Sequence, residues 1–271
     1  MTLTFECAVR SIQGGRRNQE DRALVWPGPD VLPGMADLPV LGDGRLVAVL
    51  ADGMGGHAGG ALASTMACET FISTFARAPG SVPERLRLAL DLANDAIAAK
   101  VEQRPSYSGM GSTLVGVHFG MTGIEWISVG DSPLYLYRGG EVVLLNEDHS
   151  MAPEIDRLAE AGRISWEMAR ADPRRHYLRS AVTGGEMEMI DASLKPLGLS
   201  AGDVVILASD GIHTLPMDRI ASEVRALGVE AGRGGGVVAS AERIAARLIS
   251  AVEDARESYQ DNTTVVVVRV G

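Results

Sequence analysis

Nine short apolar segments rich in branched side chains recur along this chain of 271 residues, and they constrain the fold more than any other feature. Segments of this length and composition are typical of β-strands. Two of them flank Arg138–Glu141, whose central Gly-Gly suits a two-residue hairpin turn. Because strands joined by short links pair antiparallel, the sequence predicts antiparallel sheets. The nine segments are Phe5–Val9, Ala23–Trp26, Leu46–Leu50, Thr113–Phe119, Ile124–Val129, Leu134–Tyr137, Val142–Leu145, Val204–Ala208 and Thr263–Val270.

Helical patterns occupy separate blocks of the sequence. Apolar residues repeat at spacings of three and four in Ala61–Phe75, Leu86–Val101 and Val238–Val252, as they do on one face of an amphipathic helix. Pro83 lies near the start of the second block, a position that suits the first turn of a helix. Strands and helices grouped in this way indicate an α+β fold, in contrast to a strictly alternating α/β fold. We expect one domain over residues 1–271.

Composition and charge exclude several classes of protein. The chain has 25 basic and 35 acidic side chains, and its net charge of −10 argues against a nucleic acid or an anionic membrane as partner. Without a signal-peptide pattern or an apolar run of about 18 residues, we expect a cytoplasmic protein with no membrane span. Cys7 and Cys68 are too isolated for a disulfide scaffold or a zinc site. Two segments rich in proline and glycine, Pro27–Gly44 and Gly228–Gly236, predict surface loops and not linkers between domains.

Aspartates stand at the ends of four predicted strands. Asp52, Asp131 and Asp210 follow three of the apolar segments, whereas Asp261 precedes the last one. In an antiparallel pair the start of one strand lies beside the end of its neighbour, so the four carboxylates are placed to converge on one rim. Such a cluster calls for a cation, and its hard oxygen ligands suit Mg²⁺ or Mn²⁺. Asp-Gly is also a common turn dipeptide, so ordinary turns are the alternative interpretation of the same pattern.

Two further segments each allow two interpretations. Asp52–Gly60 is glycine-rich and lies between a strand and a helix, but it lacks the pattern of a phosphate-binding loop, which disfavours a nucleotide site. His57 within it is either a general acid or a solvated loop histidine. Arg16–Asp21 is either an exposed polar turn or the source of an anion-binding arginine and two more carboxylates. Histidines without metal-ligand spacing are interpreted as structural or surface residues: His118, His149, His176 and His213.

Seven segments, taken in order, resemble the motifs of the PPM family, the metal-dependent Ser/Thr protein phosphatases of type 2C. With no fused sensor, the chain is similar to the stand-alone bacterial members. The resemblance covers nearly the whole chain, and the order and spacing of all seven segments make it specific. The segments are Arg16–Asp21, Ala51–Gly60, Gly109–Thr113, Val129–Ser132, Asp148–Ser150, Ala208–Gly211 and Asp261–Asn262.

The resemblance implies a four-layer α-β-β-α sandwich, in which two antiparallel sheets are flanked by helices and a two-metal site lies at one edge. It implies Mn²⁺ or Mg²⁺ as the cofactor, with two ions and, as in bacterial members, a third. Asp52 would bridge two ions with help from the Gly53 carbonyl. The other implied ligands are Asp210 and Asp261 for one ion, Glu20 for the other, and Asp131 with Asp210 for the third.

The implied activity is that of a protein-serine/threonine phosphatase, in which metal-activated water attacks phosphorus in line with the leaving seryl or threonyl oxygen. Asp21 would orient the water, and Arg16 would bind the phosphate, with Arg17 as the alternative in register. His57 is the candidate acid for the leaving oxygen. The implied partners are a phosphorylated protein and the pathway of an opposing Ser/Thr kinase, and we expect a monomer.

Two departures from the family pattern concern substrate contacts. Pro133 stands where arginine commonly follows the Gly-Asp-Ser segment, and the flap, residues 150–190, carries Asp172–His176 in place of the usual His-Pro-x-x-Asn. Neither change touches an implied metal ligand. Two alternatives therefore stay open, a non-catalytic regulatory binding module on the same fold and a phosphatase of small phosphate esters.

Overall fold

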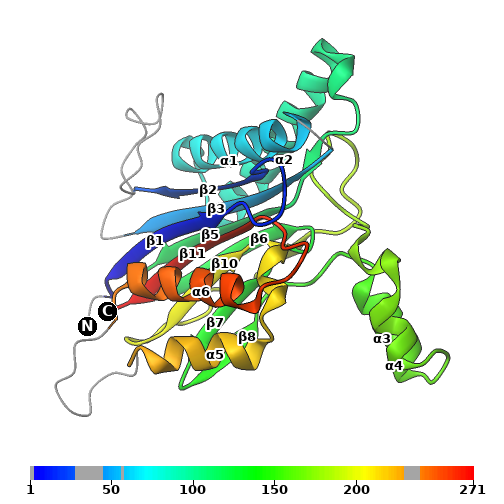
Figure 1. Ribbon diagram of the computed structural model, residues 1–271. Coiled ribbons are helices and arrows are strands. Elements are labelled where there is room, and N and C mark those ends of the chain that lie inside the picture. The colour runs from blue at the N-terminus through cyan, green and yellow to red at the C-terminus, as the bar shows by residue number, and fades with distance from the viewer. Residues whose placement is uncertain (1–2, 28–44, 56–57, 229–238) are drawn as a thin grey trace.

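Two antiparallel sheets packed face to face form the centre of the computed structural model, which describes residues 3–27, 45–55, 58–228 and 239–271 (Figure 1). In spatial order, the first sheet contains β1 (Phe5–Ile12), β11 (Thr263–Val270), β10 (Val204–Ala208), β7 (Leu134–Arg138) and β8 (Glu141–Leu144). The second sheet contains β2 (Asp21–Trp26), β3 (Leu46–Met54), β5 (Leu114–Gly120), β6 (Gly123–Val129) and β9 (Asp191–Ala192), and β4 (Gly111–Ser112) pairs with the end of β3.

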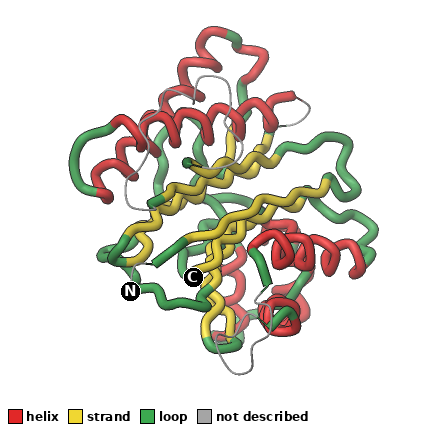
Figure 2. Tube along the Cα trace, turned by 90° about the vertical axis from the view of Figure 1, so that its left-hand side faces the viewer, coloured by secondary structure: helices red, strands yellow, loops and turns green. Residues whose placement is uncertain are grey.

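Helices cover the outer face of each sheet (Figures 1 and 2). On the second sheet pack α1 (Ala58–Arg77) and α2 (Val82–Gln103), and on the first pack α5 (Met217–Ala226) and α6 (Ala241–Ala255). This arrangement confirms the predicted four-layer α-β-β-α sandwich. Among the described helices, none is long and apolar enough to cross a membrane. The remaining short helices are α3 (Ala152–Glu160) and α4 (Trp166–Ala171), which stand apart from the layers, and η1 (Pro105–Tyr107), η2 (Pro173–His176) and η3 (Asp210–Thr214).

The alternation of side chains along β3 shows how one strand contributes to two cores. Val47, Val49 and Ala51 pack with the residues of α1 and α2, whereas Ala48 and Leu50 face the first sheet. The strands β10 and β11 alternate in the same way between the α5–α6 layer and the second sheet. Because both faces of these strands are covered, their sequences are continuous apolar runs, and the strand signal is strong.

The predicted elements are present. All nine strands occur, and the hairpin at Arg138–Glu141 is confirmed by the positive φ angles of its two glycines, 58° and 88°. The three predicted helices are α1, α2 and α6, with Pro83 in the first turn of α2. Val238 and the greater part of the two predicted loops, residues 28–44 and 229–236, lie outside the described residues. That the whole chain is one domain stays a prediction.

One boundary differs in a way that matters for the site. The predicted strand ended at Leu50, with Asp52 beyond it, but β3 continues to Met54 because Gly53 and Met54 pair with β4. The strands β4 and β9 have only two residues each, too few for an apolar pattern, and the sequence did not predict them. Asp52 therefore stands within a strand whose backbone is hydrogen-bonded on both sides.

The contact between β5 and α1 depends on a glycine. A Cβ atom on Gly116 would lie 2.1 Å from the ring of the fully buried Phe71. We predict that Gly116→Ala lowers the free energy of unfolding by about 1–3 kcal/mol, because the ring must move within a packed core. Urea denaturation measures the change. Gly198→Ala is the control, since a Cβ atom there meets nothing within 4 Å, and equal effects of the two substitutions would contradict the prediction.

Candidate functional site

A cleft of about 1540 Å³ opens at one edge of the sandwich, where the two sheets meet. Eight acidic residues from distant parts of the sequence line it, and so does Arg16. Three of them are Glu186, Glu188 and Glu257, and the other five are candidate site residues from the sequence: Glu20, Asp52, Asp131, Asp210 and Asp261. The sequence placed four of these at strand ends and the fifth beside Arg16, and the structure brings all five to one rim.

Strand register explains why two of the aspartates face each other. In the β2–β3 pair Asp21 lies directly opposite Asp52, so both side chains project from the same face of the sheet. That face is the one that Ala48 and Leu50 present to the first sheet. Asp21 is buried beneath the cleft, and its Oδ2 accepts a hydrogen bond from the Ser209 hydroxyl at the end of β10 (2.8 Å). The Asp21–Ser209 contact thus joins the two sheets under the site.

Burial and mutual repulsion make four aspartates of the site, Asp21, Asp52, Asp131 and Asp210, hold protons unusually tightly. Burial is the main cause that raises the pKa of Asp21 to about 6 and the pKa of Asp131 to about 7, and neighbouring aspartates add to it. The pKa of Asp52 is raised well above its usual value by burial and by Asp21, and that of Asp210 is raised by burial and by Asp261. A bound cation would relieve the repulsion between buried carboxylates of this kind.

The donor set fits a hard divalent cation. In the described part of the chain, the buried Oδ1 atoms of Asp21 and Asp210 have no hydrogen-bond partner. Carboxylate and carbonyl oxygens are the ligands that Mg²⁺ and Mn²⁺ prefer. Among the described residues, no group of three or more His, Cys, Asp or Glu side chains stands close enough together to hold a metal ion as it is.

The glycine after Asp52 serves a different purpose from the one that the sequence suggested. Asp-Gly is a common turn dipeptide, but Gly53 stays within β3. A Cβ atom on Gly53 would lie 2.1 Å from the Gly60 carbonyl oxygen, where α1 crosses the strand. At Gly211 the corresponding distance to the Asn262 carbonyl oxygen is 2.2 Å. Both glycines are required because two backbones touch beside the aspartates.

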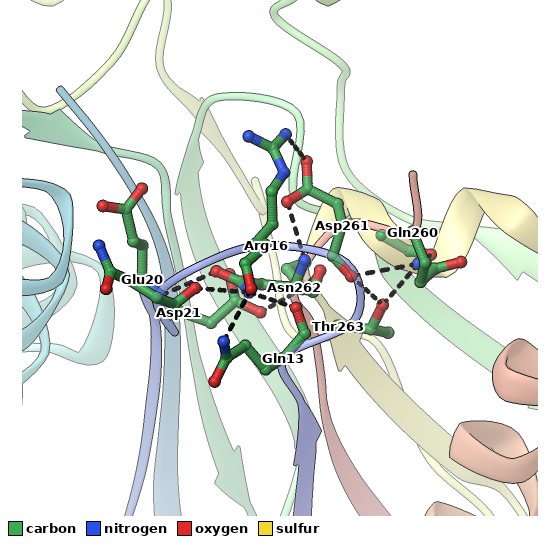
Figure 3. A network of polar contacts seen from close by, with 11 residues as sticks. Gln13, Arg16, Glu20, Asp21, Gln260, Asp261, Asn262 and Thr263 are labelled. Atoms are coloured by element: carbon green, nitrogen blue, oxygen red, sulfur yellow. Dashed lines mark hydrogen bonds and ion pairs between the residues drawn. The ribbon is translucent and has the colours of Figure 1, made fainter. Parts of the chain in front are cut away.

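The arginine next to the cleft is Arg16. Its guanidinium forms an ion pair with Asp261 (Figure 3). The charges of Asp261, Asp210 and Asp52 raise the pKa of Arg16, although partial burial opposes them. Arg17 is not among the residues that line the cleft. The geometry therefore favours Arg16 over the alternative in register.

Asn262 organises the loop that carries Arg16 and Glu20, a role that the sequence did not reveal (Figure 3). Its Oδ1 accepts a hydrogen bond from the Glu20 amide (2.8 Å), and its Nδ2 donates to the carbonyls of Gln13 (2.8 Å) and Asn18 (2.9 Å). One buried amide thus satisfies three backbone groups of a loop far away in sequence. In the sequence, only its position next to Asp261, in a segment that resembles a family motif, drew attention to Asn262. That position does not predict these hydrogen bonds.

Thr113 holds the backbone of Asp52. Its hydroxyl accepts a hydrogen bond from the Asp52 amide (3.0 Å), and its own amide donates to the Asp52 carbonyl (2.9 Å). The same hydroxyl shares a hydrogen bond with that of Ser132 (2.6 Å), in the turn that carries Asp131. Neutral hydrogen-bonding groups therefore connect two of the cleft's carboxylates beneath the surface.

A further wall of the cleft is formed by residues 176–188, the C-terminal part of the predicted flap. Asn94 of α2 anchors it with two hydrogen bonds of 2.8 Å, from its Nδ2 to the Gly185 carbonyl and from the Gly184 amide to its Oδ1. Ser112 and Val182 exchange backbone hydrogen bonds of 3.0 and 2.8 Å. This wall is thus fixed to the second sheet, although α3 and α4 stand apart from it.

The histidines divide into three groups. His57 lies outside the described residues, so its role as an acid stays a prediction. His176 and His213 are exposed on the cleft wall, a location that their spacing did not reveal. His118 and His149 are buried, as the structural interpretation expected.

Comparisons with known proteins agree on one family. Residues 36–228 match the family model described as protein phosphatase 2C. The chain is 34% identical over 248 residues to the serine/threonine protein phosphatase PstP of Mycobacterium tuberculosis, covering 87% of this chain and 44% of that protein. It is 32% identical over 176 residues to the protein phosphatase PhpP of Streptococcus pneumoniae, covering 64% of this chain and 69% of that protein. It thus spans less than half the length of the mycobacterial relative.

The fold also matches solved structures over the full chain. The catalytic domain of the serine/threonine protein phosphatase PstP, in complex with two manganese ions, superposes with a TM-score of 0.74 at 30% identity. The match covers 99% of each chain. The phosphatase MsPP of Mycobacterium smegmatis, solved with cacodylate, has a TM-score of 0.67 at 29% identity and covers 98% of each chain.

The raised pKa of Asp131 predicts a pH-dependent stability for the metal-free protein. A folded-state pKa of about 7 lies above the usual aspartate value of about 3.9, so the folded protein binds this proton more tightly than the unfolded chain does. The stabilising contribution is full below about pH 4 and is lost as the pH rises through about 7. Relative to wild type, Asp131→Asn should gain about 1–3 kcal/mol in unfolding free energy between pH 5 and pH 8.

Denaturation in EDTA across this pH range measures the difference between the two proteins, in which the contributions of the histidines cancel. Asp91→Asn, which removes an exposed carboxylate of α2, is the control and should leave the profile parallel to that of wild type. A profile for Asp131→Asn that is also parallel to wild type would contradict the prediction.

Proposed function

This chain belongs to the protein phosphatase 2C family, and we propose that it hydrolyses phosphoserine and phosphothreonine in proteins at a binuclear Mn²⁺ or Mg²⁺ centre. It would act as a cytoplasmic monomer that opposes a Ser/Thr kinase. The observation that carries the proposal is the group of carboxylates at one rim. Burial and neighbouring aspartates raise the pKa values of Asp52 and Asp131 within this group. The solved PstP domain with its two manganese ions supports the same assignment.

The proposed ligands follow the order of the matched segments. Asp52, with the Gly53 carbonyl, would bridge the two ions, Asp210 and Asp261 would complete the surroundings of one, and Glu20 would serve the other. Asp131 would join Asp210 in holding a third, weaker ion. When bound, the cations lower the pKa of water and stabilise charge on phosphoryl oxygens.

Arg16 is the proposed phosphate ligand. Its planar guanidinium suits a phosphate dianion, because two N–H groups can donate side by side. The guanidinium forms an ion pair with Asp261. A cation held by Asp261 would compete for that carboxylate and would leave the guanidinium available for a phosphate in the cleft.

Asp21 and His57 are the proposed groups for water and proton handling. Asp21 has one carboxylate oxygen held by Ser209 and the other without a partner in the described residues. The free oxygen can accept a hydrogen bond from a water molecule in the cleft above it, which would orient that water. His57 would donate the proton that the leaving seryl or threonyl oxygen requires.

The size of the cleft favours a polypeptide substrate over a small phosphate ester. Its volume of about 1540 Å³ exceeds the range of about 300–1,000 Å³ that is usual for small-molecule sites. Pro133 does not line the cleft; it is buried, and its carbonyl accepts a hydrogen bond from the Ala208 amide (3.0 Å). The replacement of arginine at this position therefore gives no support to a non-catalytic module.

The test is metal-dependent hydrolysis of a phosphothreonine peptide. We expect activity that requires Mn²⁺ or Mg²⁺ and falls by at least about 100-fold in Asp210→Asn, because losing one ligand weakens both ion binding and charge stabilisation. Calorimetric titration with Mn²⁺ should show weaker binding in the same variant. Asp91→Asn on the far surface of α2 should match wild type in both measurements.

The alternatives give different results in the same assays. A binding module would retain the phosphopeptide without turnover, and its affinity would survive Asp52→Asn. A phosphatase of small esters would show a kcat/KM on sugar or phenyl phosphates at least as high as on phosphopeptides. Undiminished hydrolysis by Asp210→Asn would overturn the proposed assignment of the ligands.

A further inference from the structure

His149 is buried, with 1% of its surface exposed, at a junction between two walls of the cleft. Its backbone amide donates to the Gly130 carbonyl (3.1 Å), and its ring Nδ1 accepts from the Gly130 amide (3.2 Å). One histidine therefore satisfies both backbone groups of the residue that precedes Asp131. Because Nδ1 accepts a hydrogen bond, the neutral ring carries its proton on Nε2, for which the described residues offer no partner.

The Gly130 peptide determines where Asp131 points. Gly130 has a φ angle of 104°, and a Cβ atom there would lie 2.6 Å from the side chain of Thr113. The turn is thus held between Thr113 on one side and His149 on the other. A rotation of the Gly130 peptide would turn Asp131 out of the cleft, so the two hydrogen bonds with His149 fix the direction of that carboxylate.

The same histidine also contacts the C-terminal part of the flap. Its carbonyl accepts a hydrogen bond from the Arg179 amide (2.8 Å), and next to it the Met151 amide donates to the Tyr177 carbonyl (2.9 Å). Tyr177 and Arg179 both line the cleft. One residue therefore links this wall of the cleft to the turn that holds Asp131.

We propose that His149 is a positioning residue that couples the flap wall of the cleft to Asp131 through the Gly130 peptide. For its effect on ion and substrate binding, this inference rests on the proposed function. The coupling itself is a property of the metal-free protein. Burial lowers the pKa of His149, which keeps the ring neutral and its Nδ1 able to accept.

Two substitutions distinguish the contribution of Nδ1 from that of Nε2. In His149→Asn, the amide oxygen can replace Nδ1 as the acceptor, whereas the longer side chain of His149→Gln places its polar group near the position of Nε2. In metal-free protein we expect the Gly130 and Arg179 amides of the Gln variant to exchange hydrogen at least about ten-fold faster than in wild type, relative to the core amide of Val266. The Asn variant should remain within about two-fold of wild type.

Binding supplies a second readout. Calorimetric titration with Mn²⁺ should show that His149→Gln lowers the affinity for the ion whose binding is lost in Asp131→Asn. In the double variant, His149→Gln should cause no loss of affinity beyond that of Asp131→Asn alone. With a phosphopeptide, KM should rise more than kcat falls, because the flap wall is displaced while the ligands of the other ions are intact. His118→Gln removes another buried histidine, on β5, and should lower stability without changing the Gly130 amide.

The proposal is overturned if the Asn and Gln variants lose Gly130 protection equally, or if neither loses it. If the Gln variant does not fold, His149→Ser takes its place. The proposal then requires the Gly130 amide to remain protected in the Asn variant and to lose protection in the Ser variant. If the wild-type protein lacks phosphatase activity, the proposed function fails, but the exchange measurement still tests the coupling on its own.

Discussion

The repulsion between carboxylates that the strand register forces together is the constraint on which the site depends. Asp21 and Asp52 are cross-strand neighbours, so the pairing of β2 with β3 holds both side chains on the same face of the sheet. Like charges in this arrangement are destabilising unless protons or cations neutralise them. The raised pKa values of Asp21 and Asp52 show that protons can neutralise these carboxylates, and the hard oxygen donors would suit a cation that does the same.

Neutral polar groups hold the charged ones in place. Ser209 ties Asp21 to the opposite sheet, Thr113 fixes the backbone of Asp52, and Asn262 fixes the loop that presents Glu20. None of these three carries a charge that would compete for a cation. Because each is buried and hydrogen-bonded more than once, the carboxylates are positioned by a frame that persists whether or not a counter-ion is present.

The sequence reveals what is periodic or local, and it is silent on contacts that folding creates. Val204–Ala208 and Thr263–Val270 are predictable strands because all of their residues except Arg269 are buried. The aspartates beside them are then placed by topology alone. The touching backbones at Gly53 and Gly60, by contrast, have no signature in either segment. Asn94 and Asn262 look like ordinary polar residues until distant loops are brought against them. Helices α3 and α4 are short and pack few apolar residues, so their pattern is too weak to predict them.

The ion pair between Arg16 and Asp261 has a consequence for how two ligands would influence each other. The two side chains bind each other, so a cation held by Asp261 and a phosphate held by Arg16, the roles proposed for them, would each release the other side chain. The first ligand to bind would bear the free energy of separating the pair, and the second would not. Cation and phosphate affinities would then be thermodynamically linked, and by reciprocity each ligand would strengthen binding of the other by the same factor.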